Sequence, residues 1–175
     1  MKVVCPLYPF AEKIVETLRQ SHETISIAES MTGGLFCFSI TSIPGSSHVF
    51  MEGLVTYTIE AKSKRLGLSK KLLEKHGVIS LFTAKAMAQN VKTTLNTDYG
   101  VSVTGNAGPD VNQIGSNVGN VFIGISNPDG TIVCKECEFS SKMERKEIQY
   151  QTVFIGLEFL WEQIQNNHKT LLREI

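Results

Sequence analysis

The chain has 175 residues, of which 42% are hydrophobic and 19% are charged, a composition typical of one soluble globular domain with its own core. Lysine plus arginine number 17 and aspartate plus glutamate number 17, and this balance argues against a general nucleic-acid or acidic-membrane binder. No apolar run is long enough to span a bilayer, and the N-terminus lacks a secretory hydrophobic region, so the expected compartment is the cytoplasm.

The N-terminal part of the chain predicts a helix, a strand and a sharp turn. Apolar residues recur at helical spacing between Phe10 and Ser21. A short apolar run then predicts a strand that ends near Ala28. A polar elbow and two glycines follow. Apolar residues resume directly at helical spacing, which predicts a second helix from near Thr32 or Gly33.

The elbow, Glu29–Gly34, is a candidate substrate site. Unpaired amides at a helix start attract anions, and glycines let a ligand approach the backbone closely. Ser30 would lie at the mouth of this turn with its hydroxyl exposed. The alternative is that Ser30 and Thr32 only cap the helix.

The rest of the chain alternates helices and strands and closes with a hairpin and a long helix. Glycine, proline and serine interrupt the apolar patterns and set most of the boundaries. We predict a strand at 53–58, helices at 59–66, 70–75 and 81–95, strands at 99–104, 118–126 and 131–139, and a long helix opening near 141 whose polar tail, from 166, frays. This order predicts a single α/β domain over residues 1–175, a three-layer α/β/α sandwich with a mixed β-sheet.

Three polar stretches fall where predicted strands end. They are Glu29–Gly34, Tyr57–Lys62 and Thr104–Pro109. Ligands of such sheets bind beyond the carboxyl ends of the strands. The three stretches are therefore expected to form one site.

Ser30 needs a base before it can act as a nucleophile. The usual base is histidine, but His22, His48, His76 and His168 are each expected at the surface, since no spacing identifies a triad.

Lys62 and Tyr57 are the better candidates for activating Ser30. A buried lysine can have a pKa low enough to act as a base, and a tyrosine hydroxyl can relay a proton or donate to a developing oxyanion. The alternative is that Lys62 is one more solvated lysine and that Tyr57 only fills the sheet surface.

Thr104–Pro109 is a second loop of small residues, whose glycines could expose amides to a phosphate or ribose. It is neither a dinucleotide fingerprint nor a P-loop, and it could simply be a turn that ends a strand. Arg145, near the start of the last helix, could reach a phosphate or could simply be exposed.

The cysteines do not predict a metal site. Cys134 and Cys137 have zinc or redox spacing, but they lie in a predicted strand, where residues three apart point to opposite faces. Cys37 lies in an apolar helical run and is expected to be a core thiol. We therefore expect no metal ion and no cofactor.

Five short motifs occur in this order: Ala28–Gly34, Val55–Lys62, Gly77–Ser80, Ala86–Ala88 and Thr104–Pro109. Together they resemble the C-terminal domain of the competence/damage-inducible CinA proteins. The resemblance covers about residues 8–165, which would form the core of the domain. It implies a three-layer α/β/α fold, assembly as a homo-oligomer, and amidohydrolase activity on nicotinamide mononucleotide.

The resemblance also implies roles for individual residues. Ser30 would be the nucleophile, assisted by Tyr57 and Lys62. The substrate, a small nucleotide, would be bound by the loops that hold Thr32, Gly33, Gly34, Thr104, Gly105, Ala107 and Gly108, together with Arg145. Neither nucleic acid nor a membrane is an expected partner.

Some positions depart from the family pattern. Asn106 stands where an apolar residue is usual, Gln149 where a second basic residue is common, and the loop 110–117 lacks the usual glycines. The rival hypothesis is therefore a catalytically weak or inactive relative that acts as a nucleotide-binding or protein-interaction module.

Overall fold

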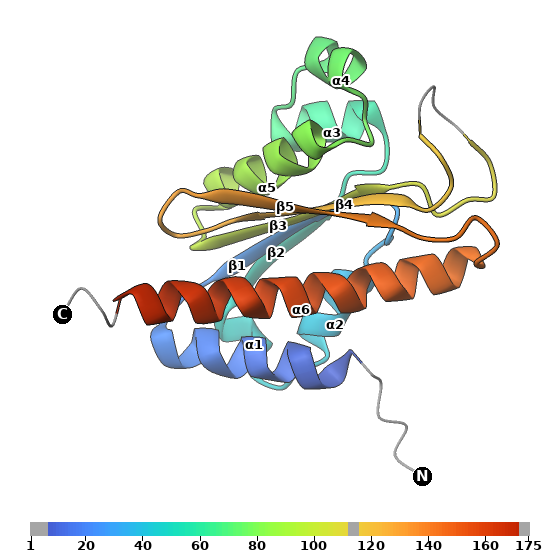
Figure 1. Ribbon diagram of the computed structural model, residues 1–175. Coiled ribbons are helices and arrows are strands. Elements are labelled where there is room, and N and C mark those ends of the chain that lie inside the picture. The colour runs from blue at the N-terminus through green and yellow to red at the C-terminus, as the bar shows by residue number, and fades with distance from the viewer. Residues whose placement is uncertain (1–6, 112–115, 172–175) are drawn as a thin grey trace.

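The computed structural model describes residues 7–111 and 116–171. Five strands form one mixed sheet in the order β2-β1-β3-β4-β5 (Figure 1). The strands are β1 (Ile25–Glu29), β2 (Phe50–Val55), β3 (Tyr99–Gly105), β4 (Asn120–Ser126) and β5 (Ile132–Glu138). β1 pairs in parallel with β2 and β3, whereas β3–β4 and β4–β5 are antiparallel. The predicted mixed sheet is confirmed.

Helices cover both faces of the sheet, which confirms the three-layer sandwich (Figure 1). On one face lie α1 (Tyr8–Ser21), α2 (Leu35–Thr41) and α6 (Arg145–Leu171), and on the other α3 (Ile59–Leu66), α4 (Lys70–His76) and α5 (Leu81–Leu95). A short 3-10 turn, η1 (Ser46–His48), precedes β2. Each face has its own buried apolar cluster. None of the described helices combines the length and apolarity needed to cross a membrane.

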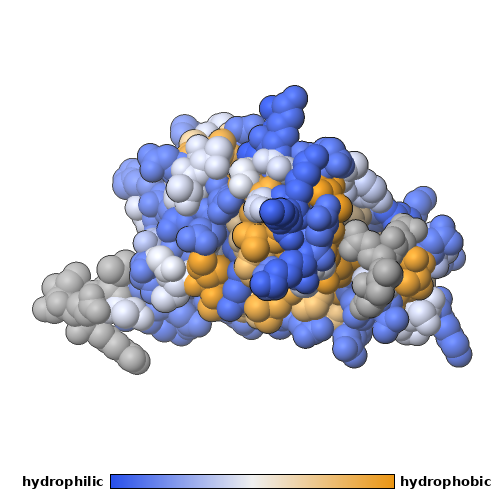
Figure 2. Space-filling view, turned by 90° about the horizontal axis from the view of Figure 1, so that it is seen from above, coloured by the Kyte–Doolittle hydropathy of each residue, from blue (hydrophilic) through white to orange (hydrophobic). Residues whose placement is uncertain are grey.

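The helix layer of α3, α4 and α5 is mostly polar at its surface, with apolar side chains gathered between the polar ones (Figure 2). Leu72, Leu81 and Phe82 are among the exposed apolar residues of this layer. With Gly67 and Leu68, Leu72 and Phe82 line a shallow groove of about 260 Å³.

Several predicted boundaries needed correction. α2 begins at Leu35 rather than near Thr32. β2 covers residues 50–55 rather than 53–58, and its register with β1 shifts between Ile25 and Ser26, so the apolar alternation does not run evenly through the strand. α6 begins at Arg145, a turn later than predicted.

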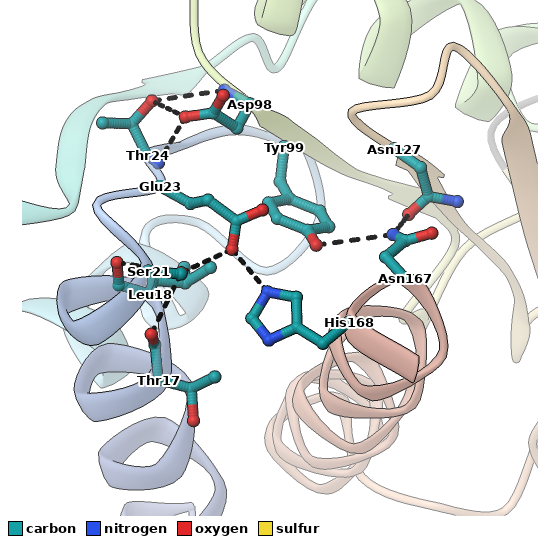
Figure 3. A network of polar contacts seen from close by, with 10 residues as sticks. All are labelled: Thr17, Leu18, Ser21, Glu23, Thr24, Asp98, Tyr99, Asn127, Asn167 and His168. Carbon is teal, nitrogen blue, oxygen red and sulfur yellow. Dashed lines mark hydrogen bonds and ion pairs between the residues drawn. The ribbon is translucent and has the colours of Figure 1, made fainter. Parts of the chain in front are cut away.

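The polar end of α6 is the largest correction, because the helix continues to Leu171 instead of fraying at 166. Its last turns contact Glu23, just before β1, and Tyr99, the first residue of β3 (Figure 3). This end of the sheet is opposite to Ser30, which follows the last residue of β1. Asn167 donates to the Tyr99 hydroxyl at 3.4 Å, and His168 lies 2.6 Å from the Glu23 carboxylate. These contacts hold a segment that the sequence alone marks as a loose tail. Residues 172–175 lie outside the described part of the chain.

The predicted positions of the cysteines are confirmed for the described residues. Cys134 and Cys137 are free thiols on β5. Cys137 packs against the apolar cluster on the α1–α2–α6 side. Burial raises the pKa of Cys134, and the charge of Lys85 on α5 partly offsets this rise, so Cys134 lies on the α5 side. The two cysteines thus face opposite sides of the sheet. Burial, and then the Glu29 carboxylate, raise the pKa of Cys37, which keeps it a protonated thiol. Cys5 lies outside the described residues.

Candidate active site

Glu29, the last residue of β1, organises the elbow that carries Ser30. Its buried carboxylate accepts hydrogen bonds from the amides of Gly34, Phe36 and Cys37, at 3.0, 3.2 and 2.8 Å. Gly33 and Gly34 have φ values of +62° and +101°, which favour glycine. The chain thereby reverses within five residues and starts α2.

This arrangement corrects the expected anion site at the start of α2. The carboxylate of Glu29 already occupies the position at which an anion would meet the helix amides. The Gly33 amide donates to the Ser30 carbonyl at 3.1 Å. Gly33 and Gly34 therefore shape the elbow, and their amides are not free to hold a ligand.

Ser30 lies against the side chain of Lys62. Lys62 Nζ is 3.0 Å from Ser30 Oγ and donates to the Thr56 carbonyl at 2.6 Å. The Thr58 hydroxyl caps α3 by accepting from the Ala61 amide, which places Lys62 in the first turn of this helix, under the end of β2. The expectation that Lys62 or Tyr57 reaches the serine hydroxyl is confirmed for Lys62.

Lys62 is fully buried, so the alternative of a solvated lysine is wrong. Burial disfavours the ammonium form and lowers the pKa of Lys62 to about 8. None of the described residues forms an ion pair with it. An amine whose pKa lies this close to neutral pH, beside a serine hydroxyl, is the arrangement that a general base requires.

Tyr57 does not contact Ser30 by a hydrogen bond within the described part of the chain. Tyr57 is 57% exposed, and its hydroxyl accepts a hydrogen bond from Arg145 Nη2 at 2.9 Å. Arg145 Nη1 donates to the Gly108 carbonyl at 2.6 Å. Tyr57 thus lies at the rim of the site, joined to α6, rather than beside Ser30.

The loop after β3 forms the opposite wall of the site. The buried Thr104 hydroxyl donates to the Val78 carbonyl at 2.8 Å, so it supports the loop before α5. Gly105 lies directly against β4, where a Cβ atom would meet Val121 at 2.7 Å. Gly108 has a φ of +76° and turns the chain beneath Arg145.

A small pocket of about 110 Å³ joins these elements. Its lining comes from three strand ends, the loop before α5, and α6, and comprises Ser30, Met31, Tyr57, Val78, Ile79, Thr104, Gly105, Asn106, Ala107 and Arg145. The three polar stretches that the sequence placed at strand ends therefore do converge. Gly108 does not line the pocket, but its carbonyl accepts a hydrogen bond from Arg145, which does.

The Thr32 hydroxyl has an unusual environment. Thr32 is 3% exposed, and among the described residues its Oγ1 is the buried side-chain oxygen that lacks a hydrogen-bond partner. An unpaired buried hydroxyl is costly, and a role in a binding or catalytic site is one explanation for its retention.

Three contributors to the site had no role predicted from the sequence: the carbonyl of Thr56, and the side chains of Asn106 and Gln149, which the sequence marked only as departures from the family pattern. Gln149 donates from Nε2 to the Met31 carbonyl at 2.7 Å, which fixes the residue after Ser30. Its position four residues after Arg145, on the same helix face, was the available signal. A main-chain carbonyl such as that of Thr56 gives no signal in the sequence.

None of the four histidines, all of which are described, lines this pocket. His22 and His48 are exposed, and His76 stacks on Phe82 at 4.2 Å between ring centroids. His168 pairs with Glu23 at the far end of the sheet. Within residues 7–111 and 116–171, no group of three or more metal-ligating side chains gathers.

Comparison with solved structures finds the same fold. The competence/damage inducible protein CihA from Agrobacterium tumefaciens has a TM-score of 0.84 and 34% identity, over 89% of this chain and 93% of that chain. A CinA superfamily protein from Klebsiella pneumoniae has a TM-score of 0.86 over 91% of this chain and 98% of that chain, at 21% identity, which speaks for the fold alone.

Comparison with curated sequences finds longer relatives. A competence-damage inducible protein of Streptococcus agalactiae serotype Ia is 48% identical over 120 residues, which are 69% of this chain and 28% of that protein. One from Streptococcus pneumoniae is 45% identical over 125 residues, 71% of this chain and 30% of that protein. The match therefore spans less than a third of these relatives.

The model of the CinA C-terminal domain family matches residues 7–164. That range contains Ser30, Lys62, the loop after β3 and Arg145. The chain therefore belongs to the family of CinA C-terminal domains.

Proposed function

We propose that this chain is an amidohydrolase that converts nicotinamide mononucleotide to nicotinate mononucleotide and ammonia, in the recycling of pyridine nucleotides. The observation that carries the proposal is the contact of 3.0 Å between Ser30 Oγ and the buried amine of Lys62. A serine and a lysine of lowered pKa form a nucleophile and its base without histidine or metal. Family membership supports the choice of reaction.

The reaction begins with neutral Lys62. As Ser30 Oγ attacks the carboxamide carbon, its proton passes to Lys62 Nζ, which the Thr56 carbonyl holds at 2.6 Å. The tetrahedral intermediate collapses when Lys62 returns this proton to the leaving nitrogen, and ammonia departs. Water then attacks the acyl-serine ester, again with Lys62 as the base.

We assign stabilisation of the oxyanion to backbone amides of the elbow that precede Gly33 and Gly34. The amides of Gly33 and Gly34 are used by Ser30 and Glu29. The amides of Met31 and Thr32, which directly follow the nucleophile, are the remaining candidates. Gln149 fixes this segment through the Met31 carbonyl.

The substrate would bind with its amide inside and its phosphate outside. The pocket of about 110 Å³ accommodates a ring-sized group, not a whole mononucleotide. Arg145 and Tyr57 are both exposed at its rim. We therefore assign the phosphate to Arg145, and the amide to the part of the pocket lined by Gly105 and Ala107.

Ammonia release from the purified chain tests this function. We expect stoichiometric ammonia and nicotinate mononucleotide from nicotinamide mononucleotide. The absence of ammonia at saturating substrate, with binding retained in calorimetry, would instead support a nucleotide-binding module. Measurement of the molar mass in solution tests separately the proposal that the chain forms a homo-oligomer.

A further inference from the structure

The side chain of Asn106 makes two hydrogen bonds to the backbone of the loop after β3. Oδ1 accepts from the Gly108 amide at 2.8 Å, and Nδ2 donates to the Asp110 carbonyl at 2.9 Å. Its backbone is also fixed, because its amide donates to the Asn120 carbonyl at 2.9 Å and its carbonyl accepts from Gly119 at 2.8 Å. Asn106 is 7% exposed and lines the pocket that contains Ser30.

A chain of hydrogen bonds runs from Asn106 to the rim of the pocket. Asn106 holds the Gly108 amide, and the carbonyl of the same Gly108 accepts from Arg145 Nη1 at 2.6 Å. Arg145 Nη2 then donates to the Tyr57 hydroxyl at 2.9 Å. A guanidinium has five N–H donors, so this orientation leaves three for a ligand.

We propose that Asn106 is a positioning residue, which holds the Arg145 guanidinium at the pocket rim in the orientation that receives the anionic group of the substrate. The identity of that substrate rests on the proposed function. An exposed arginine that is already ordered loses less conformational entropy on binding. The asparagine amide is suited to this because it accepts from one backbone group and donates to another.

The prediction for catalysis is a change in KM without a matching change in kcat. Asn106 makes no hydrogen bond to Ser30 or Lys62 within the described residues. Asn106→Ala should raise KM for nicotinamide mononucleotide about tenfold, the size expected from losing one buried hydrogen-bonded support, and leave kcat within about twofold. Asn106→Ser keeps an acceptor for the Gly108 amide and should lie between Asn106→Ala and the wild type.

A double-variant cycle separates positioning from general loosening of the fold. If Asn106 acts through Arg145, Asn106→Ala should raise KM little further in an Arg145→Ala background. The matched control is Asn127→Ala, which removes an asparagine of similar burial whose side chain bonds Thr131 Oγ1 at the far end of the sheet. This control should leave KM unchanged.

NMR of the Arg145 guanidinium tests the positioning without any substrate. In the wild type, restricted rotation should give distinct Nη–H signals, which Asn106→Ala should lose and Asn127→Ala should keep. If the signals survive in Asn106→Ala, or if the KM effects of Asn106→Ala and Arg145→Ala multiply, the proposal is wrong. If the wild type releases no ammonia, the proposed function fails, and the NMR result alone decides the role of Asn106.

Discussion

At the scale of single residues, the site depends on a lysine that the fold keeps from water. Among the largest fully buried side chains of the described residues, only that of Lys62 is ionisable to a cation. With a pKa of about 8, about a tenth of Lys62 is neutral at pH 7, against less than a thousandth for an ordinary lysine. In the proposed reaction, the burial of Lys62 supplies the base, a role that histidine fills in many serine hydrolases.

The first prediction is the pH dependence of kcat/KM. The neutral amine is the active form, so the rate should rise with pH. It should increase by about tenfold per pH unit below the pKa and level off above about 8. Steady-state assays between pH 6 and 10 measure this profile, and a rate that falls as pH rises through 8 would contradict the assignment.

Lys62 should also cost stability. Holding a charged amine away from water at neutral pH is unfavourable, and a methionine of similar length has no charge to desolvate. Lys62→Met should raise the free energy of unfolding by about 1–3 kcal/mol while abolishing ammonia release. Lys64→Met on the exposed side of the same helix is the control for chemical denaturation, and a destabilised Lys62→Met would argue that the lysine is structural.

At the scale of elements, the elbow between β1 and α2 depends on Glu29. Its carboxylate accepts three amides at the start of α2. Glu29→Ala should lower the free energy of unfolding by about 2–4 kcal/mol, because these donors lose a charged acceptor in a buried site. Glu52→Ala, an exposed glutamate on β2, is the control, and equal stability of the two variants would show that α2 does not need this cap.

The elements also show what the sequence can predict. The start of α5 follows from Ser80, whose hydroxyl accepts from the Thr83 amide as expected of an N-cap. The α2 start was missed because Glu29, a residue of the preceding strand, decides it. The end of α6 was missed because Asn167 and His168 find partners far away in sequence, Tyr99 and Glu23 (Figure 3). Helix ends set by neighbouring residues can therefore be predicted from the sequence, whereas ends set by partners far away in the sequence cannot.

At the scale of the whole molecule, the mixed sheet brings the site together. β1 lies between β2 and β3, and both neighbours run parallel to it, so Ser30, Thr56–Tyr57 and the loop after β3 meet at one edge. This convergence was predictable, because parallel strands share an end. The Arg145–Gly108 and Gln149–Met31 contacts were not, since they depend on how the last helix crosses that edge.

The central claim is that Ser30 attacks the carboxamide, and comparison of Ser30→Ala with wild type tests it most directly. Ammonia release from nicotinamide mononucleotide should fall by several powers of ten in Ser30→Ala, and nearly as far in Lys62→Ala, without a further loss in the double variant. The control is Ser42→Ala, which removes a hydroxyl that donates to the Ser39 carbonyl on α2. This variant should keep the wild-type rate. Retention of the wild-type rate by a folded Ser30→Ala variant would contradict the account.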